Sequence, residues 1–215
     1  MITVHHLEDS RSQRVLWLLE ELGMPYVVRR YERDKKTMLA PPELRAVHPL
    51  GKSPVIVDDE ADGGQGRTIA ETGAIVEYLV EKADGKLGPP AHRDAALRYR
   101  HFLHYAEGSL MPLLLIKLLL ARIPLFGKAA QKKIQPMIDV HLDYIESHLA
   151  AHDWFAGDVL TAADVMMSFP LEAGRGLAGL DGSRPATIAW LDKVHARPGY
   201  RSALAKGGPY AYASA

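Results

Sequence analysis

The sequence has no cysteine among its 215 residues. The chain therefore has no disulfide, no thiolate nucleophile and no cysteine ligand for a metal. Thiol transfer through a cysteine of the protein is excluded on chemical grounds alone. There are 10 histidines, but no H-E-x-x-H motif or other metal-ligand spacing occurs, so we expect no metal site.

A surplus of charge of either sign is also missing, because Lys+Arg and Asp+Glu number 26 each. This balance argues against nucleic acid as the main partner. No charged segment followed by an apolar one begins the sequence, so we expect no secretory signal. The most apolar stretch, residues 110–126, contains Lys117, Arg122 and two prolines. It is shorter than a membrane span, so we interpret it as a buried helix and expect a cytoplasmic protein without a membrane partner.

The first third of the chain alternates strand and helix patterns. Residues 2–7 and 26–31 are β-rich, and between them a helix is predicted to begin near Ser12 and to end before Gly23. Its apolar residues cover more than one side, so we expect it to be buried on several faces. Strand, helix and strand at this spacing predict a βαβ unit with parallel strands.

A hairpin and a second long helix complete this pattern. A short helix is predicted over 40–47. Strands at 55–57 and 67–70 flank a turn-rich segment, 60–66, and should form the hairpin. A helix is predicted over 71–82.

After a linker rich in glycine and proline, every periodic segment is helical. We predict an α/β domain over 1–83, a linker over 84–92 and an all-helical domain over 93–215. The expected helices cover 93–125, with a kink at Pro112 or a division in two, 127–151, with a bend near Pro136, 160–169 and 185–196.

One motif in the helical part is structural. Thr161 and Asp164 have the spacing of a capping box, and Leu160 with Val165 would form a hydrophobic staple. We assign no chemistry to these residues.

Several segments together resemble the cytosolic glutathione transferases over essentially the whole chain. Each segment is weak alone, but their order and intervals are specific, and two of them are most similar to a subgroup shared by bacteria and fungi. The segments are S-R-S-Q-R-V-L-W-L-L-E-E-L-G-M-P-Y, H-P-L-G-K-S-P-V-I, A-E-T-G-A-I-V-E-Y-L, Y-A-E-G-S-L-M-P-L-L, L-T-A-A-D-V and I-A-W-L-D-K-V-H-A-R-P-G-Y.

The resemblance implies a thioredoxin-like N-terminal domain, a helical bundle at the C-terminal end and a homodimer. It also implies a site for glutathione as co-substrate. Pro54 would follow a cis bond, and the backbone of Ser53 would pair with the extended peptide. Lys52 would reach the glycine carboxylate, while Glu71 and Thr72 would hold the γ-glutamyl end at a helix N-terminus. Without the resemblance, Pro54 is an ordinary strand start, Lys52 a solvated lysine and Thr72 a helix cap.

The turn E-D-S-R-S-Q-R contains the candidate catalytic residues. A serine hydroxyl can donate to a glutathione thiolate, and we favour Ser10 for this role with Ser12 in reserve. However, the slot that holds the catalytic serine in serine-type members falls on Asp9, one residue earlier. Ser10 with Gln13 also matches a capping box, which would occupy the hydroxyl. The alternative is that backbone N–H groups of residues 10–12 stabilise the thiolate.

The helical domain would carry the pocket for the second substrate. Tyr105 and Met111 lie where the resemblance places the electrophile, although ordinary helix packing explains them equally well. His101 and His104 share a helical face, which is more typical of a surface pair than of a metal site.

The leading hypothesis is an enzyme that activates the glutathione thiol for attack on small hydrophobic electrophiles, including hydroperoxides. One alternative is a non-catalytic or regulatory binding protein on the same fold. Another is a glutathione-dependent isomerase or dehalogenase.

Overall fold

The computed structural model describes residues 1–213, apart from the side chain of Asp62. It divides into two compact units, each described by itself. Unit 1 comprises residues 1–88 and 196–211, and unit 2 comprises residues 89–195 with 212 and 213. The segment 196–211 packs with the first unit, whereas the sequence patterns assign it to the helical domain over 93–215.

Unit 1 is built on a four-stranded sheet in the order β2-β1-β3-β4. β1 (Ile2–Leu7) and β2 (Tyr26–Tyr31) are parallel, which confirms the predicted βαβ unit. β3 (Val55–Asp58) is antiparallel to both β1 and β4 (Arg67–Ala70), which confirms the predicted hairpin. The helices of this unit are α1 (Ser12–Leu22), α2 (Glu43–Val47), α3 (Thr72–Lys82) and α9 (Pro198–Gly207). A 3₁₀ turn, Ala61–Gly64, lies between β3 and β4.

α1 is the centre of unit 1. It packs against β1, α3 and α9, which explains why nearly all of its residues are buried. Gly23 ends it in the left-handed conformation, with φ 73. Glycine adopts this conformation without the steric cost that a side chain adds.

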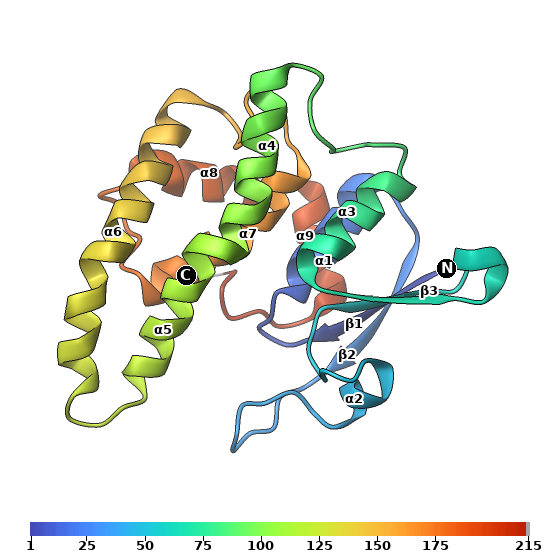
Figure 1. Ribbon diagram of the computed structural model, residues 1–215, viewed down its shortest axis with the longest axis horizontal. Coiled ribbons are helices and arrows are strands. Elements are labelled where there is room, and N and C mark those ends of the chain that lie inside the picture. The colour runs from blue at the N-terminus through green and yellow to red at the C-terminus, as the bar shows by residue number, and fades with distance from the viewer. Residues whose placement is uncertain (214–215) are drawn as a thin grey trace. The chain divides into compact units, whose positions relative to one another are not determined.

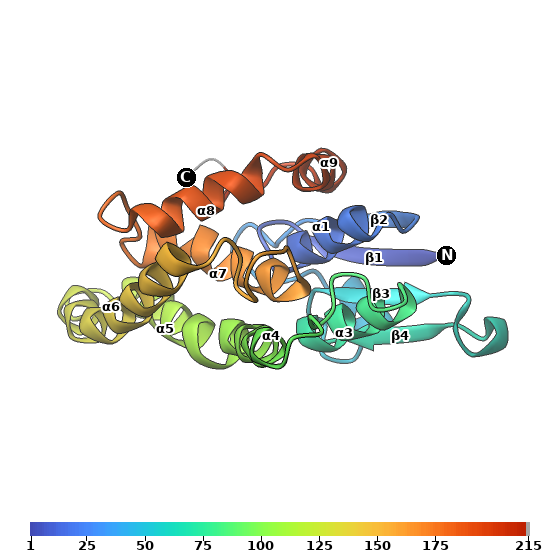
Figure 2. The ribbon, with the colours of Figure 1, turned by 90° about the horizontal axis from the view of Figure 1, so that it is seen from above.

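α9 is a helix that the sequence patterns do not predict. It lies beside α1 (Figures 1 and 2). Arg197 donates to both carboxylate oxygens of Glu21, at 2.7 and 2.8 Å. Ser202 donates to Glu20 at 2.7 Å. Polar contacts across 176 or more residues of sequence thus hold this helix to unit 1.

Unit 2 is all helical. A continuous helical stretch runs through α4 (Arg93–Tyr105), a π-helical turn η2 (Ala106–Leu110) and α5 (Met111–Ala121). The π turn precedes Pro112, which has no N–H to donate to a carbonyl in the preceding turn. The remaining helices are α6 (Gly127–Ala151), α7 (Ala162–Leu177) and α8 (Pro185–His195). Figure 2 shows α7 between the α4–α5 stretch and α8, and its residues from Ala162 to Gly174 are buried.

The predicted capping box begins α7. Asp164 is completely buried and accepts from the N–H groups of Phe155 at 2.8 Å and Thr161 at 2.9 Å. Burial raises the pKa of its carboxyl to about 6, although these donors act in the opposite direction. In α6, by contrast, Pro136 does not break the helix, which continues from Gly127 to Ala151.

The prediction that residues 110–126 form a buried helix is wrong. Within this range Leu110, Met111 and Leu114 are buried, while the rest is partly or fully exposed. α5 packs on α6 and α7 through one stripe, so its other apolar side chains face outward. Among residues 1–213, the stretch Arg93–Ala121 has the length and composition of a membrane span, and 33% of its most apolar 18-residue window is buried.

Candidate active site

The end of β1 is tied to the loop that precedes β3. The backbone N–H of Leu7 donates to Ser53 Oγ at 3.3 Å, and the Ser53 hydroxyl donates to the carbonyl of His5 at 2.9 Å. The Ser53–Pro54 bond is cis, as the resemblance implies. Pro54 is buried, Ser53 is half-buried and Lys52 is exposed.

The strand-to-helix junction at Glu71 and Thr72 adjoins this loop. Ala70 pairs with Val55, so the next register position sets Glu71 opposite Pro54. Glu71 has φ 71, a region that residues with side chains rarely adopt. Such backbone geometry persists where the surrounding structure imposes it and is frequent at binding sites. Thr72 begins α3 and is buried, whereas Glu71 is exposed.

Ser10 and Ser12 lie in a buried hydrogen-bond network. Their hydroxyl oxygens are 2.7 Å apart, and Ser10 Oγ lies 2.7 Å from the carbonyl oxygen of Leu7, to which it can donate. Ser12 Oγ is 2.8 Å from Nδ1 of His6. The backbone N–H of Ser12 donates to Ser10 Oγ at 3.3 Å.

His6 determines in which direction the hydroxyl protons of this network point. Its ring forms a further hydrogen bond with the backbone of Gly207, and Nε2 is the nitrogen on that side. Burial, and to a lesser degree the charge of Arg30, lower the pKa of His6 to about 4, so the ring is neutral at physiological pH. Since Nε2 donates to Gly207, Nδ1 accepts the proton of the Ser12 hydroxyl. The Ser10 proton then points to Leu7 or to Ser12, in either case into the protein.

The capping box weighed for Ser10 and Gln13 is not formed. Arg11 is the cap residue of α1, and its side chain forms no cap hydrogen bond. Both polar atoms of the Gln13 amide are buried without a hydrogen-bond partner among the described residues. The Ser10 hydroxyl therefore contacts the Leu7 carbonyl of β1 and the Ser12 N–H at the start of α1, and the Ser12 hydroxyl contacts His6.

Asp9 is turned toward the C-terminal segment of unit 1. Its carboxylate accepts from the backbone N–H of Ala211 at 2.7 Å, and its carbonyl accepts from Arg33 at 3.3 Å. Its φ of 46 lies in the left-handed region. The acidic residue in the usual serine slot thus fixes the chain path on either side of the turn.

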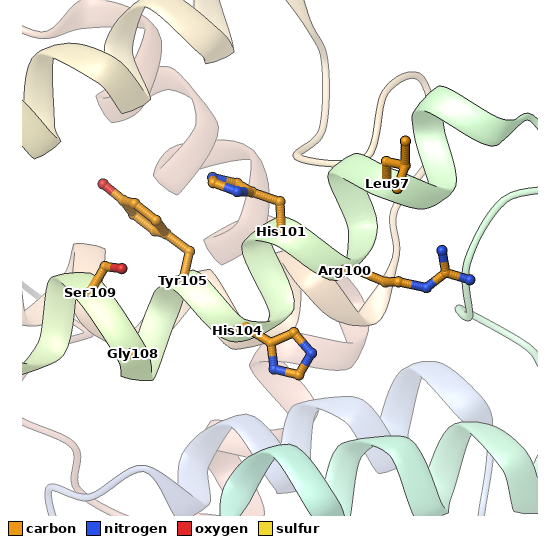
Figure 3. A pocket seen from close by; sticks show the side chains of 7 residues that line it. All are labelled: Leu97, Arg100, His101, His104, Tyr105, Gly108 and Ser109. Atoms are coloured by element: carbon orange, nitrogen blue, oxygen red, sulfur yellow. The ribbon is translucent and has the colours of Figure 1, made fainter.

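In unit 2, Tyr105 lines an open pocket of about 450 Å³ on α4 and η2 (Figure 3). Its hydroxyl is hydrogen-bonded to Nδ1 of His141, and burial raises the pKa of Tyr105 above its ordinary value. Met111 is buried and does not line this pocket. His101 and His104 both line it, but no group of metal-ligating side chains occurs within the part of the chain that the structure describes.

Comparison with known proteins matches both the N-terminal and the C-terminal part of the chain to one protein family. A family model described as "Glutathione S-transferase, N-terminal domain" matches residues 10–82. A second, "Glutathione S-transferase, C-terminal domain", matches residues 110–198. "Glutathione S-transferase 3" of Schizosaccharomyces pombe is 36% identical over 96% of this chain and 88% of its own.

Solved structures agree with these sequence matches. A glutathione S-transferase from Actinobacillus pleuropneumoniae superposes with a TM-score of 0.87, at 31% identity over 100% of this chain and 97% of its own. A glutathione transferase family member from Pseudomonas fluorescens, crystallised with two glutathione molecules, has a TM-score of 0.79 at 25% identity. It covers 94% of this chain and 92% of its own. The chain therefore belongs to the glutathione transferase family.

Proposed function

We propose that this transferase binds glutathione in unit 1 and activates its thiol for attack on small hydrophobic electrophiles. The observation that carries the proposal is that three elements meet at one end of the sheet. They are the end of β1, the loop before β3 and the junction between β4 and α3. Ser53 is bonded to the end of β1, and the strained Glu71 lies opposite Pro54 in register. β1 leads directly into the turn before α1. An extended peptide with charged ends fits a site that offers backbone groups between two helix N-termini.

Each part of the peptide has a proposed partner. The γ-glutamyl carboxylate is held by Thr72 and the N-terminus of α3, an 11-residue helix whose dipole favours an anion. Glu71, which is exposed, pairs with the γ-glutamyl amino group. The backbone of Ser53 pairs with the cysteinyl residue, and the exposed Lys52 pairs with the glycine carboxylate.

The thiol is activated by lowering its pKa from about 8.5. The catalytic roles of Ser10 and Ser12 stay predictions, and their inward-pointing hydroxyls support the alternative that backbone groups at the start of α1 stabilise the thiolate. The sulfur gives its proton to solvent and forms a bond to the electrophilic carbon, and a leaving group departs with the bonding electrons. No nucleophile from the protein is needed, in keeping with the lack of cysteine.

The pocket beside Tyr105 is proposed as the electrophile site. Its size suits a small ligand, and Tyr105 with Leu97 supplies apolar surface. Met111 is proposed to shape the pocket from behind, since it is buried in the same helical stretch.

A cytoplasmic location and a homodimer are proposed, and an exposed apolar surface on α4 and α6 supports the dimer. Val140 and Tyr144 of α6 are exposed, and the Tyr144 ring lies near Tyr105 of α4. We expect sedimentation to give the mass of a dimer for the wild type and of a monomer for Val140→Glu. Val159→Glu, at an equally apolar exposed position, is the matched control.

The central experiment is calorimetric titration with glutathione, combined with turnover of an activated aryl halide. We expect Thr72→Val to weaken glutathione binding about tenfold or more, because a hydrogen bond to a charged group is lost. Thr68→Val, at an exposed position on β4, should bind as the wild type does. Absence of both glutathione binding and turnover with several electrophiles would refute the proposal.

A second candidate function is a binding or regulatory protein that holds glutathione without activating it. It is favoured by Asp9 in the customary serine slot and by the buried serine hydroxyls. The ultraviolet absorbance of bound glutathione separates the two functions. A thiolate band at neutral pH supports the transferase, whereas binding without that band supports the regulatory protein. An isomerase or dehalogenase would show the same band and differ in its substrate.

A further inference from the structure

The end of the α5–α6 hairpin is the most exposed apolar segment of unit 2. We define the hairpin tip as residues 119–133, where α5 ends and α6 begins (Figure 1). Leu125 is 94% exposed and Phe126 is 77% exposed, and Leu119 and Ile123 are exposed as well. A loop that packed on its own helices would bury side chains of this kind.

The backbone of the tip holds these side chains outward. Leu125 has φ 65, a left-handed conformation that is unfavourable for a bulky residue. Pro124 precedes it and fixes the turn between the two helices. Strained backbone geometry and exposed apolar side chains are both frequent at interaction sites. Their combination at Leu125 indicates that this side chain contacts another apolar surface.

The tip is also strongly cationic in a chain of zero net charge. Residues 108–138 contain five basic side chains and no acidic one. Lys117 is partly buried and bonded to Gln135, so it serves the hairpin itself. Four cations are exposed, and none of them forms an ion pair with another described residue; they are Arg122, Lys128, Lys132 and Lys133.

We propose that the hairpin tip is a docking surface for an anionic lipid membrane, with Leu125 and Phe126 entering the interface and the four cations pairing with lipid phosphates. Apolar side chains flanked by lysine and arginine are the combination that binds such an interface. The tip lies on the membrane and does not span it. The apolar stretch is interrupted by Lys117, Arg122 and two prolines, and a span needs about 20 largely apolar residues.

Charge argues against a second copy of this chain as the occupant. A two-fold contact through the tip would bring the four cations of one copy against the four of the other. Like charges so placed repel one another, whereas an anionic membrane attracts all of them. The exposed surface proposed for the dimer lies on α4 and further along α6, so the two surfaces are separate in sequence.

Vesicle flotation tests the proposal with the full chain. We expect the wild type to float with vesicles of phosphatidylcholine containing phosphatidylglycerol, and to stay in solution with phosphatidylcholine alone. Raising the salt to about 0.5 M should release most of the protein, because the attraction is screened over a few ångströms.

Variants locate the binding surface. Lys132→Gln with Lys133→Gln should weaken vesicle affinity about thirtyfold, and Phe126→Ser should weaken it as well by removing apolar contact. The matched controls are Lys35→Gln with Lys36→Gln, another adjacent exposed lysine pair, and Leu39→Ser, at another exposed apolar position. These controls should float as the wild type does.

A reporter tests insertion directly. The three native tryptophans, Trp17, Trp154 and Trp190, are buried. Phe126→Trp therefore adds an exposed fluorophore, whose emission should shift to the blue and become protected from a soluble quencher on anionic vesicles.

Three results would overturn the proposal. The first is no flotation with anionic vesicles at low salt, and the second is flotation that the tip variants leave unchanged. The third is a change of oligomeric mass on Phe126→Ser, which would make the tip a contact between copies.

Discussion

The turn before α1 buries polar side chains, whereas the hairpin tip exposes apolar ones. At the turn, Ser10, Ser12 and His6 are polar yet buried, and each is hydrogen-bonded. At the tip, Leu125 and Phe126 are apolar yet exposed, beside cations that form no ion pair with any described residue. A buried polar group that is fully paired holds one conformation, whereas an exposed apolar group stabilises nothing within its own unit. The difference indicates that the turn is built for rigidity and the tip for an external contact.

The largest effect is expected at Asp164, a completely buried carboxyl group of unit 2. Asp164→Ala should lower the free energy of unfolding by about 3 kcal/mol, because the N–H groups of Phe155 and Thr161 lose their acceptor while buried. Urea unfolding measures the change. Asp158→Ala, at an exposed position, is the control and should change it by less than about 0.5 kcal/mol. Equal effects of the two variants would contradict the role given to burial.

The next effect is the pH dependence contributed by His6. Its pKa is about 4 in the folded chain and about 6.5 when unfolded, so the unfolded chain takes up the proton first as the pH falls. The stability from neutral His6 is thus present above pH 6.5 and lost toward pH 4, by about 2 kcal/mol. His6→Gln should flatten the decline of unfolding free energy between pH 7 and 4.5.

The quantity to measure is the difference in unfolding free energy between the wild type and His6→Gln at each pH, because other groups titrate in the same range. The Asp164 carboxyl, with a pKa raised to about 6, acts with the opposite sign below that pH. His92→Gln, an exposed control, should keep the wild-type decline. An unchanged decline in His6→Gln would show that the turn does not exclude the proton.

A smaller effect is expected for Ser10→Ala. Loss of the bonds to Leu7 and Ser12 should lower stability by about 1 kcal/mol. Because the hydroxyl proton points inward, turnover with an activated aryl halide should fall less than tenfold and glutathione affinity should stay the same. A tenfold or larger loss of turnover with unchanged stability would indicate instead that the Ser10 hydroxyl donates to the glutathione thiolate.

The smallest effect is expected at the tip. Phe126→Ser should change the free energy of unfolding by less than about 0.5 kcal/mol, since the side chain is 77% exposed. The same urea titration measures this. A loss comparable to that of Asp164→Ala would mean that Phe126 packs within unit 2, and the contrast between turn and tip would disappear.

Local patterns in the sequence predicted the elements that depend on local causes. The alternation around residues 2–31 predicted the βαβ unit, and the spacing of Thr161 and Asp164 predicted the capping box. Both follow from propensity and side-chain reach within one or two turns. The family resemblance added the cis bond before Pro54.

The remaining features depend on distant partners. An apolar run shows that a helix has apolar residues but not what covers them, so the exposure of Leu125 could not be read from it. The direction of the Ser10 hydroxyl depends on His6, whose ring is oriented by Gly207 at the other end of unit 1. α9 is held by Glu20 and Glu21 of α1, so its own composition carries little sign of its place.

The docking of α9 on α1 has a consequence for the order in which the chain is made. Unit 2 is in effect inserted between two pieces of unit 1, and the second piece, residues 196–211, is synthesised after it. Until that piece emerges from the ribosome, Glu20, Glu21 and Asp9 lack their partners Ser202, Arg197 and Ala211. Unit 1 therefore lacks its last helix at a stage when residues 89–195, which contain all the helices of unit 2, can already form the core of that unit.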